Sequence, residues 1–231
     1  LAVVATTTQI CDYVTQIAAK SADISLDKTD AAGKSSHVGA PADGAALTMS
    51  LTCLLAPNAS AHEHEMTPAQ TSALAQADVM AVSGVDLEHF LDDAVVSSGF
   101  KGRMIVTSGV LTAADIDNPG TPDPEGAYTI DRGSERVDVA PWPFPPEEAG
   151  EEPEFRFDPH VWTSPKGARV QVANLGAGLA AAAPDAASSI NAATASYLED
   201  IDALDQWTAE AIETVPEGQR VLFTSHDAFG Y

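Results

Sequence analysis

Short apolar runs alternate along the first half of the chain with segments whose apolar residues recur at helical spacing. The apolar runs predict strands at residues 1–8, 46–55, 79–83 and 104–108. The helical segments lie at residues 9–20, from Thr67-Pro68 onward, and at residues 87–96. Strands that alternate with helices form βαβ units. The sequence therefore predicts the α/β class, with a lobe built around a parallel βαβ sheet.

Two segments interrupt this alternation. Residues 21–45 are polar, rich in Gly, Ser and Asp, and without a period, which predicts a surface insertion. Residues 115–158 are rich in proline and carry a glutamate cluster at Glu147, Glu148, Glu151, Glu152 and Glu154. Because structureless stretches longer than about 15 residues are uncommon in a compact domain, we expect a long mobile loop here. Two interpretations stay open, a solvated insertion or a loop that gathers cations beside a metal site.

A helical pattern returns in the last third of the chain. It begins at Ser164-Pro165, where an N-cap serine precedes proline, and stops before Pro184. A long helix is predicted over residues 188–215 and, at about 1.5 Å per residue, makes a rod of roughly 40 Å. Residues 220–224 then predict a new strand. Because this strand has no sheet left to join, we expect the parent protein to continue for about a hundred residues.

The charge balance excludes one class of partner and favours another. The chain has 11 Lys and Arg against 34 Asp and Glu, a formal net charge of −23 at pH 7. Such a surface repels the phosphate backbone of nucleic acids and attracts cations. No apolar run approaches the roughly 20 residues of a membrane span. Residue 1 opens directly into an apolar run without a basic-then-apolar leader, which predicts that a signal segment has been removed.

The two cysteines, Cys11 and Cys53, leave two alternatives open. In an oxidising compartment they form one disulfide, and in the cytosol they are two buried thiols. Cys11 lies at the start of the first predicted helix and Cys53 in the neighbouring strand. Packing of that helix on the sheet would bring them together, so we expect the disulfide if the protein is secreted.

Three histidine motifs lie beside the ends of predicted elements. They contain His62 in Ala-His-Glu-His-Glu-Met-Thr-Pro, His160 in Asp-Pro-His-Val-Trp, and His226 in Ser-His-Asp-Ala-Phe-Gly-Tyr. The first and third follow the carboxyl end of a strand, where open α/β sheets bind ligands. Imidazole nitrogens brought together there suit zinc. Taken singly, each histidine is more often an ordinary loop residue, which is the interpretation for His37 and His89.

Signatures of catalysis are missing from the sequence. The zinc-protease pattern His-Glu-x-x-His is absent, because Met66 occupies the position of its second histidine. There is also no Gly-x-Gly-x-x-Gly, no Walker loop and no Gly-x-Ser-x-Gly. Spacing alone therefore permits a metal site and specifies no reaction.

Taken together, the three motifs resemble those of the zinc/manganese-type solute-binding proteins of bacterial ABC transporters, the cluster A-I family. Residues 62–68 resemble the family's Asp-Pro-His-x-Tyr-Glu-Pro-Thr-Pro, and residues 158–162 match its Asn/Asp-Pro-His-x-Trp. Residues 225–231 match its Ser/Thr-His-Asp-Ala-Phe-Gly-Tyr, and residues 77–88 resemble its Ala-Asp…Gly…Leu-Glu segment. The sequence departs from the family pattern at Ala61 and Met66 (usually Pro), at His64 (usually Tyr), in the segment 21–45 and in its Pro/Glu-rich loop.

The resemblance implies two α/β lobes joined by one long helix, with the metal in the cleft between them. Residues 1–187 would form the N-terminal lobe, 188–215 the interlobe helix and 219–231 the start of a truncated second lobe. It implies that His62, His160 and His226 bind the metal, with a fourth contact, a carboxylate or a water, from the second lobe.

The implied function is not enzymatic. An extracytoplasmic, monomeric protein captures a divalent metal and delivers it to an ABC permease for import. Its removed N-terminal segment could carry a lipid anchor.

Ligand chemistry indicates which metal the resemblance implies. Three imidazoles favour zinc, whereas a carboxylate in place of one favours manganese, and His226 stands where manganese-type members have glutamate. Asp158, Asp227 and Glu65 are candidates to accept the free ring N–H of a ligating histidine. Asp227 is equally well explained as a helix N-cap.

Two other functions stay open from the sequence. A zinc hydrolase would keep a coordination position for water and use Glu63 or Glu65 as general base. A manganese-binding lipoprotein or surface adhesin of the same family is the other, although no residue pattern argues for binding a host protein.

Overall fold

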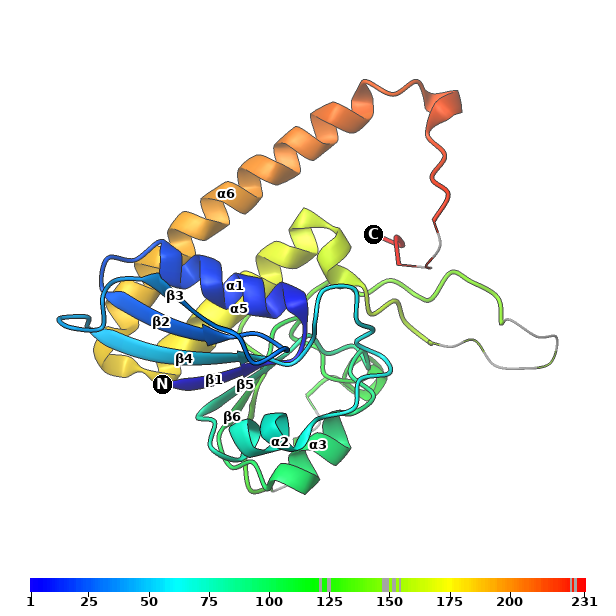
Figure 1. The fold of residues 1–231 in the computed structure, drawn as a ribbon. Helices are drawn as coiled ribbons and strands as arrows, with labels where there is room; N and C mark the ends of the chain where they lie inside the picture. Colours follow the sequence, from blue (N-terminus) through cyan, green and yellow to red (C-terminus); the bar gives the residue numbers. More distant parts are fainter. Residues whose placement is uncertain are drawn as a thin grey trace.

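In the described part of the chain, seven strands form one sheet in the order β3-β2-β4-β1-β5-β6-β7 (Figure 1). The computed structural model describes residues 1–120, 122–123, 126–146, 150, 153, 155–224, 226 and 228–231. The strands are β1 (Ala2–Ala5), β2 (Ile24–Thr29), β3 (Ser35–Gly39), β4 (Leu47–Cys53), β5 (Val79–Val82), β6 (Arg103–Val106) and β7 (Thr129–Asp131). All neighbours pair in parallel except β2 and β3, which are antiparallel. The predicted α/β class is confirmed.

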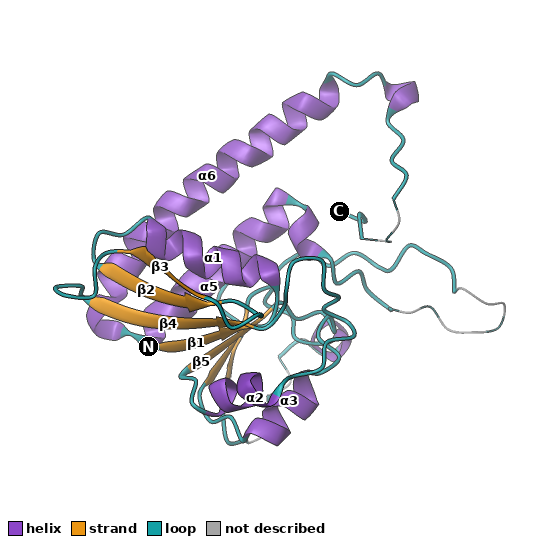
Figure 2. Cartoon of the chain, in the orientation of Figure 1, coloured by secondary structure: helices purple, strands orange, loops and turns teal. Residues whose placement is uncertain are grey.

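Helices cover both faces of this sheet (Figure 2). They are α1 (Thr8–Ala19), α2 (Pro68–Ala75), α3 (Leu91–Ser98), α4 (Ala113–Asp117), α5 (Pro165–Ala182) and α6 (Ala187–Glu213). Alternate residues of β1 point to opposite faces: Val3 and Ala5 pack in the core with α1, α5 and α6, and Val4 packs with α2 and α3. Because both faces are buried, the strand is an unbroken apolar run.

The prediction of a surface insertion at residues 21–45 is wrong. β2 lies there, pairs with β4 and buries Ile24 and Leu26 completely, and β3 returns beside it as the edge of the sheet. The apolar part of β2 is short, and most residues of β3 are exposed. An exposed edge strand is usually polar, because polar side chains discourage pairing with other chains. The hairpin is therefore as polar as a loop, and its composition does not distinguish it from one.

The prediction that residues 115–158 lack secondary structure is wrong at two places. α4 ends inside this segment, and β7 adds to the sheet beside β6. Farther along, the two arms of the loop pair with each other: the Trp142 N–H donates to the Arg156 carbonyl, and the Asp158 N–H donates to the Ala140 carbonyl. The glutamate cluster lies outside the described residues. This pairing fixes the position of Asp158, which lies two residues before His160.

The helix predicted over residues 87–96 begins later, as α3 at Leu91. Gly84, Val85 and Asp86 have positive φ angles, so the chain makes a left-handed turn after β5 before any helix can start. This turn contributes to the site, as described below.

The long helix α6 confirms the predicted rod. Its first half packs on α5 and buries Ile190 and Ile201, and its second half projects beyond the sheet, where Trp207 is 64% exposed (Figure 1).

Residues 220–224, predicted as a strand, pair with no strand in the described part of the chain, and Phe223 is 92% exposed. A strand needs a partner for its backbone groups, and no described strand lies beside this segment. Among the described residues, no helix combines the length and apolar composition needed to cross a membrane.

The predicted disulfide joins Cys11 to Cys53, with the two Cα atoms 5.6 Å apart. Cys11 lies in the first turns of α1 and Cys53 is the last residue of β4. The bond therefore ties α1 to the end of the strand that leads into the segment carrying His62.

Candidate metal centre

Three histidines from distant parts of the sequence meet at the carboxyl-terminal edge of the sheet. His62 lies between β4 and α2, His160 lies just before the short helix Val161–Thr163 that leads into α5, and His226 lies in the C-terminal segment. One ring nitrogen from each histidine lies within 4.8 Å of the other two. The structure thus brings together the three histidines that the sequence motifs single out.

Both ends of the segment that carries His62 are anchored. The disulfide holds the preceding strand, and Thr67 caps the following helix, α2. The Gln70 N–H donates to the Thr67 hydroxyl (3.3 Å), and the Thr67 N–H donates to the Gln70 side-chain oxygen (2.9 Å). Pro68 occupies the first turn, as the sequence predicts. The reciprocal cap fixes where the helix begins and so where the histidine segment ends.

His160 is buried and has a carboxylate as its ring partner. Its Nδ1 lies 2.8 Å from Oδ1 of Asp158, and its backbone N–H donates to the same oxygen at 2.9 Å. An ionised carboxylate only accepts hydrogen bonds, so the ring proton lies on Nδ1 and Nε2 keeps its lone pair. Asp158 itself is fully buried. The pair leaves Nε2 of His160 with a lone pair that a metal ion could use.

His62 is oriented by the backbone instead of by a carboxylate. Its Nδ1 lies 3.3 Å from the carbonyl oxygen of Leu87, which leaves Nε2 free. Burial, followed by the neighbouring charge of His160, lowers the pKa of His62 to about 4. The ring is therefore neutral at physiological pH, as metal binding requires.

His226 faces His160 directly, with their Nε2 atoms 3.1 Å apart. Because His160 has its proton on Nδ1, its Nε2 offers only a lone pair to this contact. His226 must therefore either donate a proton to that nitrogen or share a cation with it. Three converging imidazole nitrogens, two of them presented as lone pairs, are a donor set that suits a divalent transition-metal ion.

Tyr231 joins the C-terminal segment to the lobe. Its hydroxyl donates to the Asp158 carbonyl (2.7 Å) and accepts from the Ala140 N–H (3.2 Å). Burial raises the pKa of Tyr231 to about 12, so the hydroxyl keeps the proton that it donates. This contact holds residues 228–231, and with them His226, against the segment that carries His160.

Aromatic rings lie beside His62 and His160. Phe155 lies 5.0 Å from the His62 ring, and Trp162 lies 5.3 Å from the His160 ring, measured between centroids. Trp142, on the opposite arm of the long loop, lies 6.0 Å from His160. A cavity of about 530 Å³ opens beside the three histidines and is lined also by Thr8, Leu55 and Trp162. Most residues that line this cavity are polar and His226 is exposed, so the nitrogens stay accessible to solvent from this side.

Glu65 and the remaining histidines are not part of the converging group. Glu65 is exposed and lines a separate hollow with His64 and Phe90, on the side of α3. His37 lies on β3 and contacts Asp27 at 2.9 Å. His89 is exposed, with its ring centroid 5.8 Å from that of His62, and does not share the group of converging nitrogens. Asp227 lies outside the described residues.

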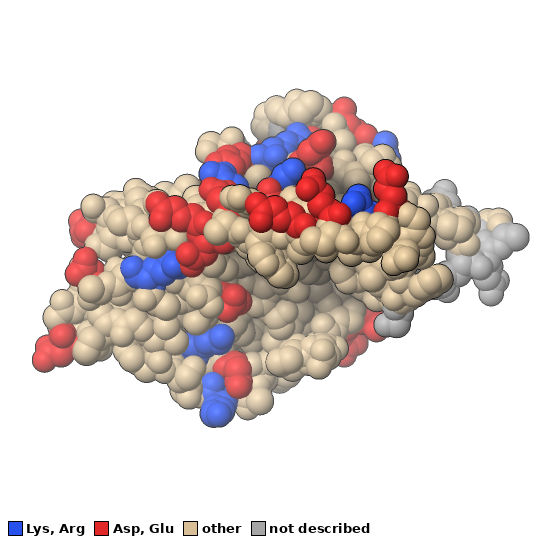
Figure 3. Space-filling model, turned by 90° about the horizontal axis from the view of Figure 1, so that it is seen from above, with Lys and Arg blue, Asp and Glu red and all other residues tan. Residues whose placement is uncertain are grey.

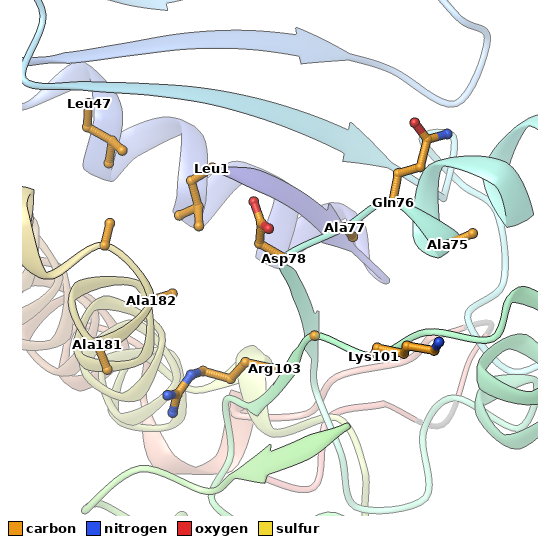
Figure 4. Close-up of a pocket in the computed structure, with 12 residues that line it drawn as sticks. Leu1, Leu47, Ala75, Gln76, Ala77, Asp78, Lys101, Arg103, Ala181 and Ala182 are labelled. Carbon is orange, nitrogen blue, oxygen red and sulfur yellow. The ribbon is translucent and has the colours of Figure 1, made fainter. Parts of the chain in front are cut away.

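Another cavity lies at the opposite edge of the sheet and lacks the chemistry of a metal site. Its volume is about 720 Å³, and Asp78, Lys101 and Arg103 line it at the amino-terminal ends of the strands (Figure 4). Asp78 accepts a hydrogen bond from the Ala2 N–H, and Arg103 pairs with Asp131. Among the described residues its lining contains no histidine or cysteine.

Acidic side chains form patches on the face of the molecule seen in Figure 3, with several Lys and Arg side chains among them. Exposed acidic residues on α6 are Glu199, Asp200, Asp202, Glu210 and Glu213. Such a surface raises the local concentration of cations around the chain.

The fold and the site define the class of this chain: an α/β lobe with a long helix and an imidazole cluster at the strand ends. A family model described as zinc-uptake complex component A, periplasmic (ZnuA), matches residues 42–231. The chain belongs to this family. The family is one of metal-uptake components and not of enzymes.

Curated relatives support the assignment. The manganese-binding lipoprotein MntA of Bacillus subtilis is 29% identical over 217 residues, which cover 94% of this chain and 60% of that protein. The zinc-binding protein AdcA of Streptococcus pyogenes is 37% identical over 75 residues, 32% of this chain and 14% of that protein. The chain thus spans 60% of the length of MntA.

Solved structures share the fold. The periplasmic zinc-binding protein TroA of Treponema pallidum superposes with a TM-score of 0.60 at 20% identity, covering 99% of this chain and 61% of that one. Zn(II)-bound AdcA of Streptococcus pneumoniae gives a TM-score of 0.57 at 19% identity, covering 92% and 32%. At this level of identity the likeness concerns the architecture.

Proposed function

We propose that this chain is the metal-capturing part of an extracytoplasmic solute-binding protein that binds zinc and delivers it to an ABC permease for import. The observation that carries the proposal is the convergence of one ring nitrogen each from His62, His160 and His226 within 4.8 Å. The Nδ1 atoms of His62 and His160 have acceptors of their own. Their Nε2 atoms are therefore free for the ion.

Zinc fits this donor set better than manganese. Imidazole nitrogens suit zinc, whereas manganese prefers carboxylate and other oxygen ligands. Among the described residues, the converging group contains no carboxylate. The relatives divide on this point, since AdcA is named for zinc and MntA for manganese. We therefore choose zinc over manganese on the chemistry of the ligands.

The proposed organisation follows the sequence prediction. Residues 1–187 form the metal-binding lobe, 188–215 the interlobe helix and 219–231 the opening of a second lobe, which supplies a carboxylate or a water as fourth ligand. Trp207, Leu222 and Phe223 have exposed apolar side chains. Because exposed apolar groups often mark an interface, they support the proposal that a second lobe packs beside them.

The proposed location is extracytoplasmic. The disulfide suits an oxidising compartment, the family is described as periplasmic, and MntA is named as a lipoprotein. We propose a monomer, anchored to lipid through a segment that precedes residue 1.

Calorimetric zinc titration of five single variants tests the ligand assignment. His62→Ala, His160→Ala and His226→Ala should each weaken binding by more than the roughly 10–100-fold that loss of an outer partner costs. His64→Ala and His89→Ala are the matched controls, because each removes a histidine ring that is not part of the converging group, and they should stay near the wild-type affinity. Manganese should be displaced by zinc in competition. Wild-type affinity in His160→Ala, or equal losses in His64→Ala and His62→Ala, would show that the ligands are assigned wrongly.

A further inference from the structure

The turn that follows β5 has an unusual backbone. Gly84, Val85 and Asp86 have φ angles of 87°, 58° and 56°. Gly84 is required there, because a Cβ atom at this position would lie 2.1 Å from the Val110 carbonyl oxygen. Val85 is β-branched, and such residues rarely adopt the left-handed region. A turn of this shape persists only where its surroundings hold it.

Two kinds of contact hold the turn. The Val85 N–H donates to the Val110 carbonyl (2.8 Å), and the Asp86 N–H donates to the Leu111 carbonyl (3.1 Å). From the inner side, the buried carboxylate of Glu88 folds back beneath it. Its Oε1 accepts from the Ser83 N–H (2.7 Å), and its Oε2 accepts from the Gly84 N–H (3.1 Å). Glu88 thereby binds the residues at which the turn begins.

The tip of β1 completes this arrangement. The Thr6 hydroxyl donates to Oε1 of Glu88 at 2.6 Å, so the carboxylate has three donors inside the core. Burial raises the pKa of Glu88, and these donors act in the opposite direction because they stabilise the charged form. In the described part of the chain, Glu88 makes no contact with the converging histidine nitrogens.

The turn ends at the carbonyl that orients His62. Leu87 lies between Asp86 and Glu88, its side chain is fully buried, and its carbonyl oxygen lies 3.3 Å from Nδ1 of His62. A carbonyl oxygen only accepts, so it places the ring proton on Nδ1. The direction of this oxygen depends on the backbone of the turn before Leu87 and on the anchored position of Glu88 after it.

We propose that Glu88 is a positioning residue for His62: by holding the left-handed turn it aims the Leu87 carbonyl at Nδ1 and so leaves Nε2 as the nitrogen that binds the metal. The inference deepens the proposed function. Its zinc-affinity measurement rests on that function, whereas the measurement of the His62 tautomer does not. A purely structural role for Glu88 would lower stability without changing the ring tautomer of His62, so the tautomer separates the two.

The test compares variants of the 231-residue chain. Glu88→Ala removes all three acceptor contacts, whereas Glu88→Gln keeps one acceptor oxygen for Thr6 and Ser83 and turns an amide nitrogen toward the Gly84 N–H. Thr6→Val removes one donor at nearly constant volume. Leu26→Ala, in the fully buried core of β2, is the control for loss of stability away from the site. Two readouts are used: the ring tautomer of His62 in the metal-free protein, by long-range ¹H–¹⁵N spectra, and the zinc affinity, by calorimetry.

We expect a single Nδ1–H tautomer for His62 in the wild type and in Leu26→Ala. Glu88→Ala should give a mixture of tautomers and zinc binding weaker by about 10–100-fold, the usual cost of losing an outer-shell partner. Glu88→Gln and Thr6→Val should lie between. Wild-type tautomer and affinity in a folded Glu88→Ala overturn the inference, and if that variant does not fold, wild-type values in both milder variants do so. A tautomer shift without zinc binding in any protein, wild type included, keeps the positioning role and refutes the proposed function.

Discussion

The placement of one proton decides which nitrogen of an imidazole is free to bind a metal. For His160 the acceptor is Asp158, two residues earlier, and that partner could be predicted from the motif. For His62 the acceptor is the Leu87 carbonyl, 25 residues away along the chain. No sequence pattern could identify it, because every residue has a backbone carbonyl and because Val85 is a poor residue for the left-handed turn that aims it.

The low pKa of His62 predicts its behaviour in acid. Its ring should titrate near pH 4 instead of at the ordinary value of 6.5, because burial and the charge of His160 disfavour the imidazolium. Ring ¹H–¹³C spectra recorded between pH 3 and 8 measure the midpoint. His160→Ala removes one of the two largest causes, so the His62 midpoint should rise in that variant. An unshifted midpoint in the wild type would contradict the buried environment.

The same shift predicts how stability depends on pH. Between about 4 and 6.5 the unfolded chain binds a proton at His62 that the folded chain does not. The contribution of this group is therefore fully present above pH 6.5 and is lost as the pH falls toward 4. Urea unfolding should show a shallower pH dependence in this window for His62→Ala than for the wild type, and equal slopes would contradict the prediction.

Elements with a continuous apolar run or a long helical period could be predicted, and the short or polar edge strands could not. β1, β5 and β6 are continuous apolar runs, and α6 has a long helical period, so their positions follow from the sequence. β2 and β3 were hidden because the hairpin forms the sheet edge and is polar on its exposed side, and β7 is short. What fixes these strands is pairing with a neighbour, which leaves little trace in local composition.

The disulfide should contribute strongly to the stability of the lobe. It closes a 42-residue separation between α1 and β4, for which the chain-entropy estimate is about 4 kcal/mol. We expect Cys11→Ala/Cys53→Ala to lose about that much free energy of unfolding in urea. Dithiothreitol should lower the stability of the wild type and leave the double variant unchanged. Equal midpoints for the two oxidised proteins would contradict the prediction.

At the scale of the molecule, a net charge of −23 surrounds a site that contains neutral imidazoles. The acidic surface attracts any cation, whereas in the proposed function the histidine cluster selects for ions that prefer nitrogen ligands. Selectivity and attraction therefore come from different parts of the protein.

Thermal unfolding separates these two effects. A ligand that binds only the folded state at about 100 times its Kd stabilises by roughly 2.7 kcal/mol. Zinc should therefore raise the Tm of the wild type, and magnesium, which prefers oxygen ligands, should leave it nearly unchanged. His160→Ala should lose the zinc effect. A rise with magnesium as large as that with zinc would mean that the acidic surface, and not the histidines, binds the ion.

Diffraction at the zinc absorption edge from crystals grown with zinc tests the central claim most directly. The account predicts one strong anomalous peak at about 2.0–2.1 Å from the Nε2 atoms of His62, His160 and His226. The Nδ1 atoms of His62 and His160 should remain on Leu87 and Asp158. A peak on His64, His89 or a carboxylate cluster, with none between the three histidines, would contradict it.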